Sequence, residues 1–310
     1  MSPLEIVSLS PSNVHNDLFS GFVQDEIRLP HDIRLTIGSK VQRDDFSGFQ
    51  AQPTIRALWR PSERQAVWGA ITSAVRTPSW TELFGTANAQ GFVGPDGQPG
   101  LVVVQGNRSL KPERELSYET GYRWLGAGGA SIDMATFYST FKGIVDNSTN
   151  APYRDVAGRL IVPLPFENAV FGHSVGAEIL ASDRITDRID LRAGYTWLYI
   201  VDHDLDDNPN PIGVDDSPSH QFQLRAHFNL SPTVEVDSSA NLVSRLRATD
   251  VPSYVRVDLH LAWHLFAAWE LSLVGQNLFD DKHREFAGYS EPSAGPINRS
   301  VYGKITWHSH

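Results

Sequence analysis

The 310-residue sequence contains no cysteine. The chain can therefore form no disulfide, no thiolate metal site and no cysteine nucleophile. It also lacks any apolar run of about twenty residues, the length that a membrane-spanning helix needs, and its mean hydropathy is -0.27. These absences exclude a helical membrane protein. They leave open a β-barrel, because strands that alternate apolar and polar residues keep the mean hydropathy modest.

Positive charge is scarce, since 36 acidic residues against 26 basic ones give a net charge of -10. This balance argues against a nucleic-acid partner, which would require a basic face. The first ten residues, MSPLEIVSLS, have neither the charged nor the apolar part of a secretion signal. We therefore expect either a cytosolic protein or a chain that lacks its true N-terminus. No G-x-S-x-G elbow and no phosphate-binding glycine loop occur, so we expect no enzymatic activity.

Strict alternation of apolar and polar residues is the main pattern. In QFQLRAHFNL (221–230) every second residue is apolar, and the same holds over 255–264, as in strands with one face in an apolar environment and one in a polar one. The pattern predicts strands at 19–29, 33–42, 52–60, 66–75, 115–124, 130–141, 169–181, 188–199, 220–230, 233–243, 254–265, 269–277 and 299–307, with a further one over 3–10. Helical periodicity is convincing nowhere.

The connections between these strands alternate between short and long. Short turns are expected at 30–32, 61–65, 125–129, 182–187, 231–232 and 266–268, and long loops at 43–51, 76–114, 142–168, 200–219, 244–253 and 278–298. In an up-and-down sheet alternate connections lie at the same end, so all long loops would share one rim. Transmembrane barrels of outer membranes have this asymmetry. Aromatic residues near the predicted strand ends fit an interfacial girdle: Trp59, Trp124, Trp197, Tyr199, Trp263, Trp269 and Trp307.

Six segments, in order, resemble the C-terminal barrel of the TonB-dependent outer-membrane receptors. They are NDLFSGFVQDEIRL (16–29), AVRTPSWTEL (74–83), GNRSLKPERELSYETGYRW (106–124), ASIDMATFYSTFKGIVDN (130–147), LVGQNLFDDKHREF (273–286) and NRSVYGKITW (298–307). The resemblance implies an all-β fold, an antiparallel transmembrane β-barrel in the bacterial outer membrane. It further implies that residues 1–310 supply about 13–14 strands of an expected 22-stranded barrel, without a plug domain or TonB box.

Proteins of that family import scarce ligands with energy delivered by TonB through the plug. The resemblance therefore implies three partners, namely outer-membrane lipid, a ferric siderophore or similar small ligand, and TonB acting through a plug domain absent from this chain. No cofactor is expected. The chain would be either a fragment or a truncated gene product. Two alternatives stay open: a self-closing diffusion porin of fourteen strands, in which 3–10 would pair with 299–307, and a soluble glycan-binding β-sandwich.

The longest predicted loop, 76–114, holds the candidate ligand-binding residues, because long loops in compact proteins are usually functional or disordered. Arginine and aromatic side chains carry much of the energy at binding surfaces, so we select Arg76, Trp80, Phe84 and Phe92. For Arg76 the alternative is a salt bridge that positions the barrel rim. For the loop as a whole, the alternative is a solvated lid without specific contacts.

Two patterns suggest metal but are better explained without it. In loop 200–219, Asp202, Asp204 and Asp206 have a D-x-D-x-D spacing, yet Asp207 stands where an EF-hand needs glycine, so we expect a solvated acidic loop. The remaining acids of this loop are Asp215 and Asp216. The histidines His227, His260 and His264 lie on polar strand faces without metal-ligand spacing and are expected to line the lumen, while His173 and His203 stand alone. No metal site is predicted.

Overall fold

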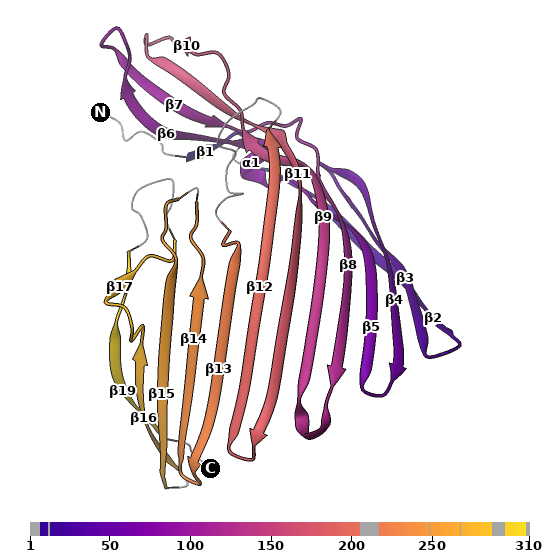
Figure 1. Cartoon of the computed structure of the whole chain (residues 1–310). Coiled ribbons are helices and arrows are strands. Elements are labelled where there is room, and N and C mark those ends of the chain that lie inside the picture. Colours follow the sequence, from indigo (N-terminus) through magenta and orange to yellow (C-terminus); the bar gives the residue numbers. More distant parts are fainter. Residues whose placement is uncertain are drawn as a thin grey trace.

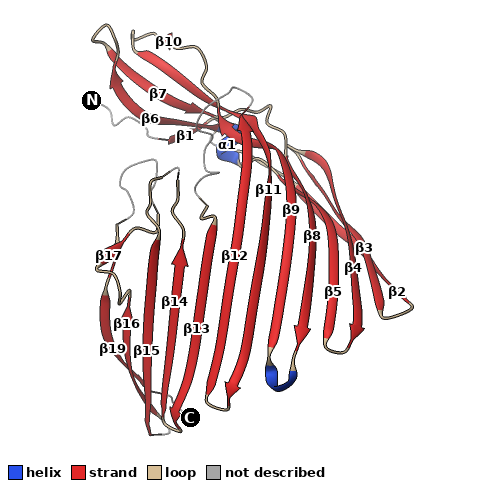
Figure 2. Ribbon diagram, in the orientation of Figure 1, coloured by secondary structure: helices blue, strands red, loops and turns tan. Residues whose placement is uncertain are grey.

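The structure is a computed structural model that describes residues 7–11, 13–204, 217–247, 249–266, 268–286 and 295–307, apart from the side chain of Asp204. Thirteen long strands form one curved wall (Figures 1 and 2). They are β2 (Leu18–Leu29), β3 (Ile33–Asp44), β4 (Gly48–Ser62), β5 (Gln65–Arg76), β8 (Glu113–Leu125), β9 (Ser131–Asn147), β11 (Leu160–Thr186), β12 (Ile189–Asp204), β13 (His220–Ser231), β14 (Val234–Val243), β15 (Tyr254–Phe266), β16 (Trp269–Gln276) and β19 (Ser300–Trp307). These confirm the thirteen predicted strands.

Each wall strand pairs antiparallel with the next one along the chain, from β2 to β19. The six predicted short turns all join such neighbours, and they lie together at the lower end of the wall in Figure 1. A one-turn 3-10 helix, η1 (Ala127–Gly129), occupies one of them. In the part of the chain that is described, no helix is long and apolar enough to cross a membrane.

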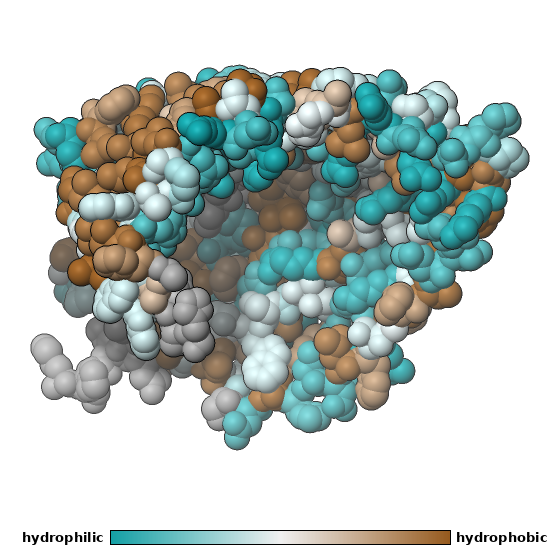
Figure 3. All heavy atoms as spheres, turned by 90° about the horizontal axis from the view of Figure 1, so that it is seen from below, coloured by the Kyte–Doolittle hydropathy of each residue, from teal (hydrophilic) through white to brown (hydrophobic). Residues whose placement is uncertain are grey.

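The two faces of the wall differ in chemistry because successive residues of a strand point to opposite sides. On β8, Leu116, Tyr118 and Trp124 share one face, and Leu116 and Tyr118 are exposed. Glu115, Ser117 and Glu119 share the other. Figure 3, viewed from below, shows an arch with apolar residues over much of its outer surface at the upper left and a hollow inside. The exposed apolar face is incompatible with the two-sheet core of a soluble sandwich.

Tryptophans mark the short-turn end of the apolar face. Trp59, Trp263, Trp269 and Trp307 are all exposed there, and the rings of Trp269 and Trp307 lie 6.4 Å apart on neighbouring strands. Amphipathic aromatic rings are enriched where a barrel leaves the hydrocarbon layer. The predicted girdle is therefore present at this end of the wall.

The predicted loop 76–114 is not structureless. It contains helix α1 (Trp80–Phe84), which the sequence pattern did not predict, and the hairpin of β6 (Gly85–Val93) and β7 (Pro99–Gln105). The first residues of β11 leave the wall to pair in parallel with β7, and they also pair with β10 (Tyr153–Arg154). β1 (Val7–Leu9) pairs with β6. These segments form an upper sheet that leans over the loop end of the wall (Figure 1).

Several loop predictions were therefore wrong. Residues 43–51 form a tight hairpin between β3 and β4, because the Asp44 carboxylate accepts hydrogen bonds from the amides of Phe46 (2.9 Å) and Ser47 (2.6 Å) and Gly48 takes a left-handed φ of 67°. Much of 142–168 is strand. The predicted strand over 3–10 does not close the wall against 299–307, since its described residues pair with β6. Within 278–298, β17 (Lys282–His283) pairs with β18 (Ile297–Asn298).

Candidate binding site at the loop end of the wall

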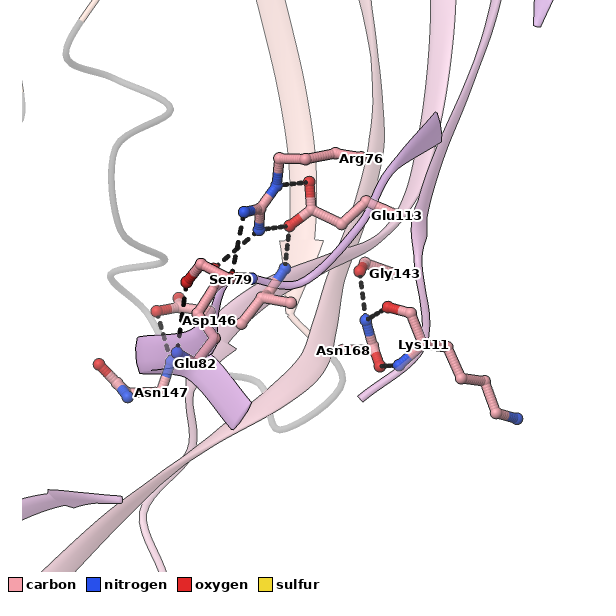
Figure 4. Close-up of polar contacts among 10 residues, drawn as sticks. Arg76, Ser79, Glu82, Lys111, Glu113, Gly143, Asp146, Asn147 and Asn168 are labelled. Carbon is pink, nitrogen blue, oxygen red and sulfur yellow. Dashed lines mark hydrogen bonds and ion pairs between the residues drawn. The ribbon is translucent and has the colours of Figure 1, made fainter. Parts of the chain in front are cut away.

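Arg76 is the centre of an ion-pair network at the loop end of the wall (Figure 4). It is the last residue of β5 and lies opposite Glu113, the first residue of β8. Its Nε donates to Glu113 Oε2 at 2.6 Å, and its Nη2 contacts Glu113 Oε1. Its Nη1 and Nη2 also donate to the two oxygens of Glu82, at 3.2 and 2.9 Å. One guanidinium thus ties two adjacent wall strands to helix α1.

Helix α1 is held by a capping box, in which Ser79 and Glu82 bond each other's backbone amides. The Ser79 hydroxyl accepts from the Glu82 amide at 3.3 Å, and Glu82 Oε2 accepts from the Ser79 amide at 2.6 Å. Burial alone would raise the pKa of Glu82, but the hydrogen bonds from Arg76 and Ser79 outweigh it, so this pKa lies below its ordinary value. Glu82 is therefore a carboxylate at neutral pH.

Glu113 extends the network to β9. It is buried, with 7% of its surface exposed, and its Oε1 accepts from the Val145 amide at 2.8 Å. Asn168 of β11 makes a second set of connections nearby. Its side chain donates to the carbonyls of Lys111 (2.9 Å) and Gly143 (2.7 Å) and accepts from the Lys111 amide (2.8 Å). Figure 4 shows the two clusters close together. Hydrogen bonds thus join helix α1, at the base of the upper sheet, to the wall strands β5, β8 and β9.

Apolar packing supports the same junction. Most of the buried apolar residues lie where the upper sheet meets the wall: Leu83, Val103, Leu110, Ile161, Ala169 and Val170. The wall itself has few such residues, because a single sheet has no second layer to bury its side chains. The stability of the upper sheet therefore depends on this local core and on the ion pairs beside it.

The four predicted binding residues have different surroundings. Arg76 makes the rim salt bridge that was its alternative interpretation. Phe84 packs edge-on against Phe46 at 5.3 Å between ring centroids, and the Phe92 ring covers Gly100 of β7, where an added Cβ would lie 2.4 Å from the ring. Trp80, 46% exposed, has the most accessible of the aromatic side chains. Ligand contact by any of the four stays a prediction.

Sequence reasoning missed other residues of the rim. The guanidinium of Arg108 lies 5.0 Å from the centre of the Phe84 ring, and it donates to the Ser10 carbonyl at 3.0 Å. Arg154 of β10 forms an ion pair with Asp96 in the turn between β6 and β7. The hydrogen bond from the Gln98 amide and the charge of Arg154 lower the pKa of Asp96. The Pro95-Asp96-Gly97 triplet was a usable turn signal.

The predicted inward-facing histidines lie on the polar face, as expected. His227 and His260 contact the two oxygens of Asp237, at 2.7 and 3.2 Å, and His264 lies 3.3 Å from Glu235. His203 instead packs beside Phe171, at 5.5 Å. Among the residues that the structure places, no group of three histidine or acidic side chains converges on a metal position. The acidic loop falls mainly outside the described residues.

Comparison with known proteins gives a consistent result. A family model described as TonB dependent receptor-like, beta-barrel, matches residues 3–278. The iron-regulated outer membrane virulence protein of Vibrio cholerae is 23% identical over 294 residues, which cover 88% of this chain and 42% of that protein. The ferrioxamine receptor of Yersinia enterocolitica is 26% identical over 183 residues, 57% of this chain and 24% of that protein. The chain thus spans less than half the length of these relatives.

Solved structures show the same fold at low sequence identity. The siderophore receptor PirA from Acinetobacter baumannii superposes with a TM-score of 0.72 at 14% identity, covering 94% of this chain and 46% of that one. A mutant of the ferric enterobactin receptor from Pseudomonas aeruginosa gives a TM-score of 0.74 at 16% identity, covering 94% and 45%. The fold described above is therefore that of about half of each of these receptors.

Proposed function

This chain belongs to the TonB-dependent receptor-like β-barrel family of bacterial outer-membrane proteins, and we propose that it captures a ferric siderophore at its loop end. We further propose that residues 1–310 are the C-terminal portion of the receptor barrel, and that TonB acts on the receptor through a plug domain encoded outside this chain. The named relatives are receptors and an outer-membrane virulence protein, in keeping with the expectation that the chain is not an enzyme.

The observation that carries this proposal is the folded rim. A solvated lid would need no internal structure, whereas here the connection 76–114 is built into helix α1 and the β6–β7 hairpin and is fixed to the wall through Arg76 and Asn168. Ligand sites are usually largely preformed. The rim holds the exposed Trp80 on a helix that is fixed by its capping box and by Arg76, and such preorganisation reduces the entropic cost of binding.

A ligand captured at the loop end of the wall could next move along the polar face of the wall. The apolar face contacts lipid, and the polar face lines the interior, where Gln223 and Asn241 lie directly opposite each other on β13 and β14. A hydrated interior allows a polar chelate to move after release from the rim. The step that releases it is assigned to the plug and TonB, and not to residues of this chain.

The direct test is binding of ferric siderophores, labelled with radioactive iron, to outer-membrane vesicles that contain this chain. Ferrioxamine and a ferric catecholate are the two probes. We expect saturable binding of at least one, which is lost when residues 85–105 are replaced by a Gly-Ser linker and weakened about tenfold by Trp80→Ala. Saturable binding that is unchanged in both variants, or no binding of either probe by correctly inserted protein, would overturn the proposal.

The domain assignment has a separate test, which is to sequence the DNA immediately upstream of Met1. A stretch that encodes a plug and further strands would support the assignment of residues 1–310 to a longer receptor. A promoter and ribosome-binding site without such a stretch would favour the alternative of a short diffusion porin.

A further inference from the structure

Two arginines lie directly opposite each other on the polar face of the wall. Arg192 of β12 pairs in register with Arg225 of β13, and both side chains are exposed. Like charges at directly opposed positions of an antiparallel pair destabilise the sheet. Throughout the described ranges neither guanidinium makes an ion pair or a hydrogen bond with another side chain. The wall therefore carries two adjacent positive charges that it does not neutralise itself.

Three carboxylates lie in the same region of the polar face as this pair, and each is bound by other groups. Asp190 accepts from Arg184 Nε at 3.2 Å. Asp237 is shared by His227 and His260, at 2.7 and 3.2 Å. The third, Asp258, accepts from Arg256 Nε at 3.0 and 3.1 Å and from the Asn277 amide at 2.9 Å. Each acid thus has its own cationic partner or hydrogen-bond donor, and in the part of the chain that the structure describes none of the three forms an ion pair with Arg192 or Arg225.

A hollow of about 580 Å³ opens beside the pair, a volume typical of small-molecule sites. Both arginines line it, together with the Ser239 hydroxyl, which lies opposite Arg225 in the register. Gln276 lines it as well, and so do the three carboxylates Asp190, Asp237 and Asp258. The hollow therefore combines two guanidinium groups that have no ion-pair partner among the described residues with neutral polar groups, and its three carboxylates are already hydrogen-bonded to other groups.

We propose that Arg192 and Arg225 form a binding site for a small oxyanion, a carboxylate or phosphate group on a small molecule. The guanidinium group presents a planar fork of N–H donors that matches the two oxygens of such an anion. Two forks from adjacent strands bind one anion from two directions, and the anion removes the repulsion between them. Anion binding by these arginines does not depend on the proposed receptor function. Only the idea that an anionic ligand passes this site on its way through the interior rests on that function.

The test uses the 310-residue chain folded in detergent micelles, with folding checked by circular dichroism. The probes are inorganic phosphate and citrate, and binding is measured by calorimetric titration. We expect saturable binding of one of them to the unmodified chain, weakened at least tenfold in the double variant Arg192→Gln/Arg225→Gln. The charge-preserving variant Arg192→Lys/Arg225→Lys should lose several-fold, because lysine lacks the fork.

The matched control is Arg123→Gln, which removes an inward-facing arginine of the same wall whose partner is Asp133. It should bind the probes as the unmodified chain does. In anion-free buffer the double glutamine variant should unfold at the same temperature as the unmodified chain or at a higher one, because the repulsion between the two arginines is removed. This measurement distinguishes a loss of anion binding from a loss of folding. Absence of binding by the folded unmodified chain, or equal loss in the Arg123 control, would overturn the proposal. Neither result depends on siderophore capture.

Discussion

Replacing Arg76 with alanine tests whether the rim network stabilises the fold. The change removes four hydrogen bonds, two to Glu113 and two to Glu82. Hydrogen bonds to charged groups contribute about 1.5 to 3 kcal/mol each when well formed. The Arg76 side chain, however, is 49% exposed, so water replaces part of this energy and the full sum does not apply.

The larger cost comes from Glu113, whose side chain is only 9% exposed. Removing one partner of a fully buried pair costs about 3–5 kcal/mol. Glu113 keeps the hydrogen bond from the Val145 amide, which lowers this cost. We therefore expect Arg76→Ala to reduce the free energy of unfolding by about 2–3 kcal/mol, intermediate between a surface pair and a buried one.

The assay is urea unfolding of the folded chain in detergent, followed by circular dichroism. The matched control is Arg123→Ala, which breaks the pair with Asp133 at 61% and 37% exposure and should cost about 0–1 kcal/mol. A double-mutant cycle with Glu113→Gln should return a coupling energy of at least about 1 kcal/mol. If Arg76→Ala costs no more than the control and the coupling is zero, the network does not stabilise the rim and the reasoning is wrong.

Three further predictions follow from the same structure. The pKa of Glu82 is lowered in the folded state. The contribution of its carboxylate to the stability of the fold is therefore complete above the ordinary glutamate pKa of about 4.3 and is lost as the pH falls below that value. The difference in thermal midpoint between the unmodified chain and Glu82→Gln should be present at about pH 7 and shrink towards about pH 3. Asn168→Leu removes three hydrogen bonds to Lys111 and Gly143 and should lower the free energy of unfolding by about 2 kcal/mol. Limited proteolysis should then cleave the upper sheet faster, and an unchanged cleavage rate would contradict the prediction. Leu273→Arg, on the lipid-facing side of β16, should destabilise the chain in lipid vesicles by about 2–4 kcal/mol, whereas Val274→Arg, its neighbour on the polar face, should cost much less; equal costs would contradict the assignment of the faces.

The wall could be predicted from sequence because its signal is local. Alternation over about ten residues, as in 221–230, identifies a strand and its two faces without knowledge of its neighbours. The alternation pattern does not predict the Asp44–Gly48 hairpin, because the polar stretch DFSG (45–48) does not alternate; an Asx turn followed by glycine explains the hairpin. Helix α1 was missed because five residues show no helical period, yet the Ser79-to-Glu82 spacing is a capping-box signature.

The upper sheet could not be predicted, because its pairing is non-local. β7 is a continuous apolar run, LVVV, which lacks alternation, and its parallel partner in β11 lies about sixty residues away in the chain. The anion site on the wall has the same origin. Arg192 and Arg225 are separated in the sequence by the acidic loop, and only the register of β12 and β13 places them opposite each other.

Register also decides what Arg76 does. Its residue type was a sound reason to select it for ligand binding, because a free arginine at a rim is well suited to an anionic ligand. A slip of one residue between β5 and β8 would move Glu113 to the other face of the wall, so that Arg76 would lose its buried partner and keep only its contacts with Glu82. In the observed register the side chains of Arg76 and Glu113, which are 37 residues apart in the sequence, form an ion pair. The Arg76 guanidinium is therefore already bonded within the protein. Under the proposed function, exposed groups such as Trp80 would therefore select the ligand, and an Arg76 variant should alter ligand binding only as far as it loosens helix α1.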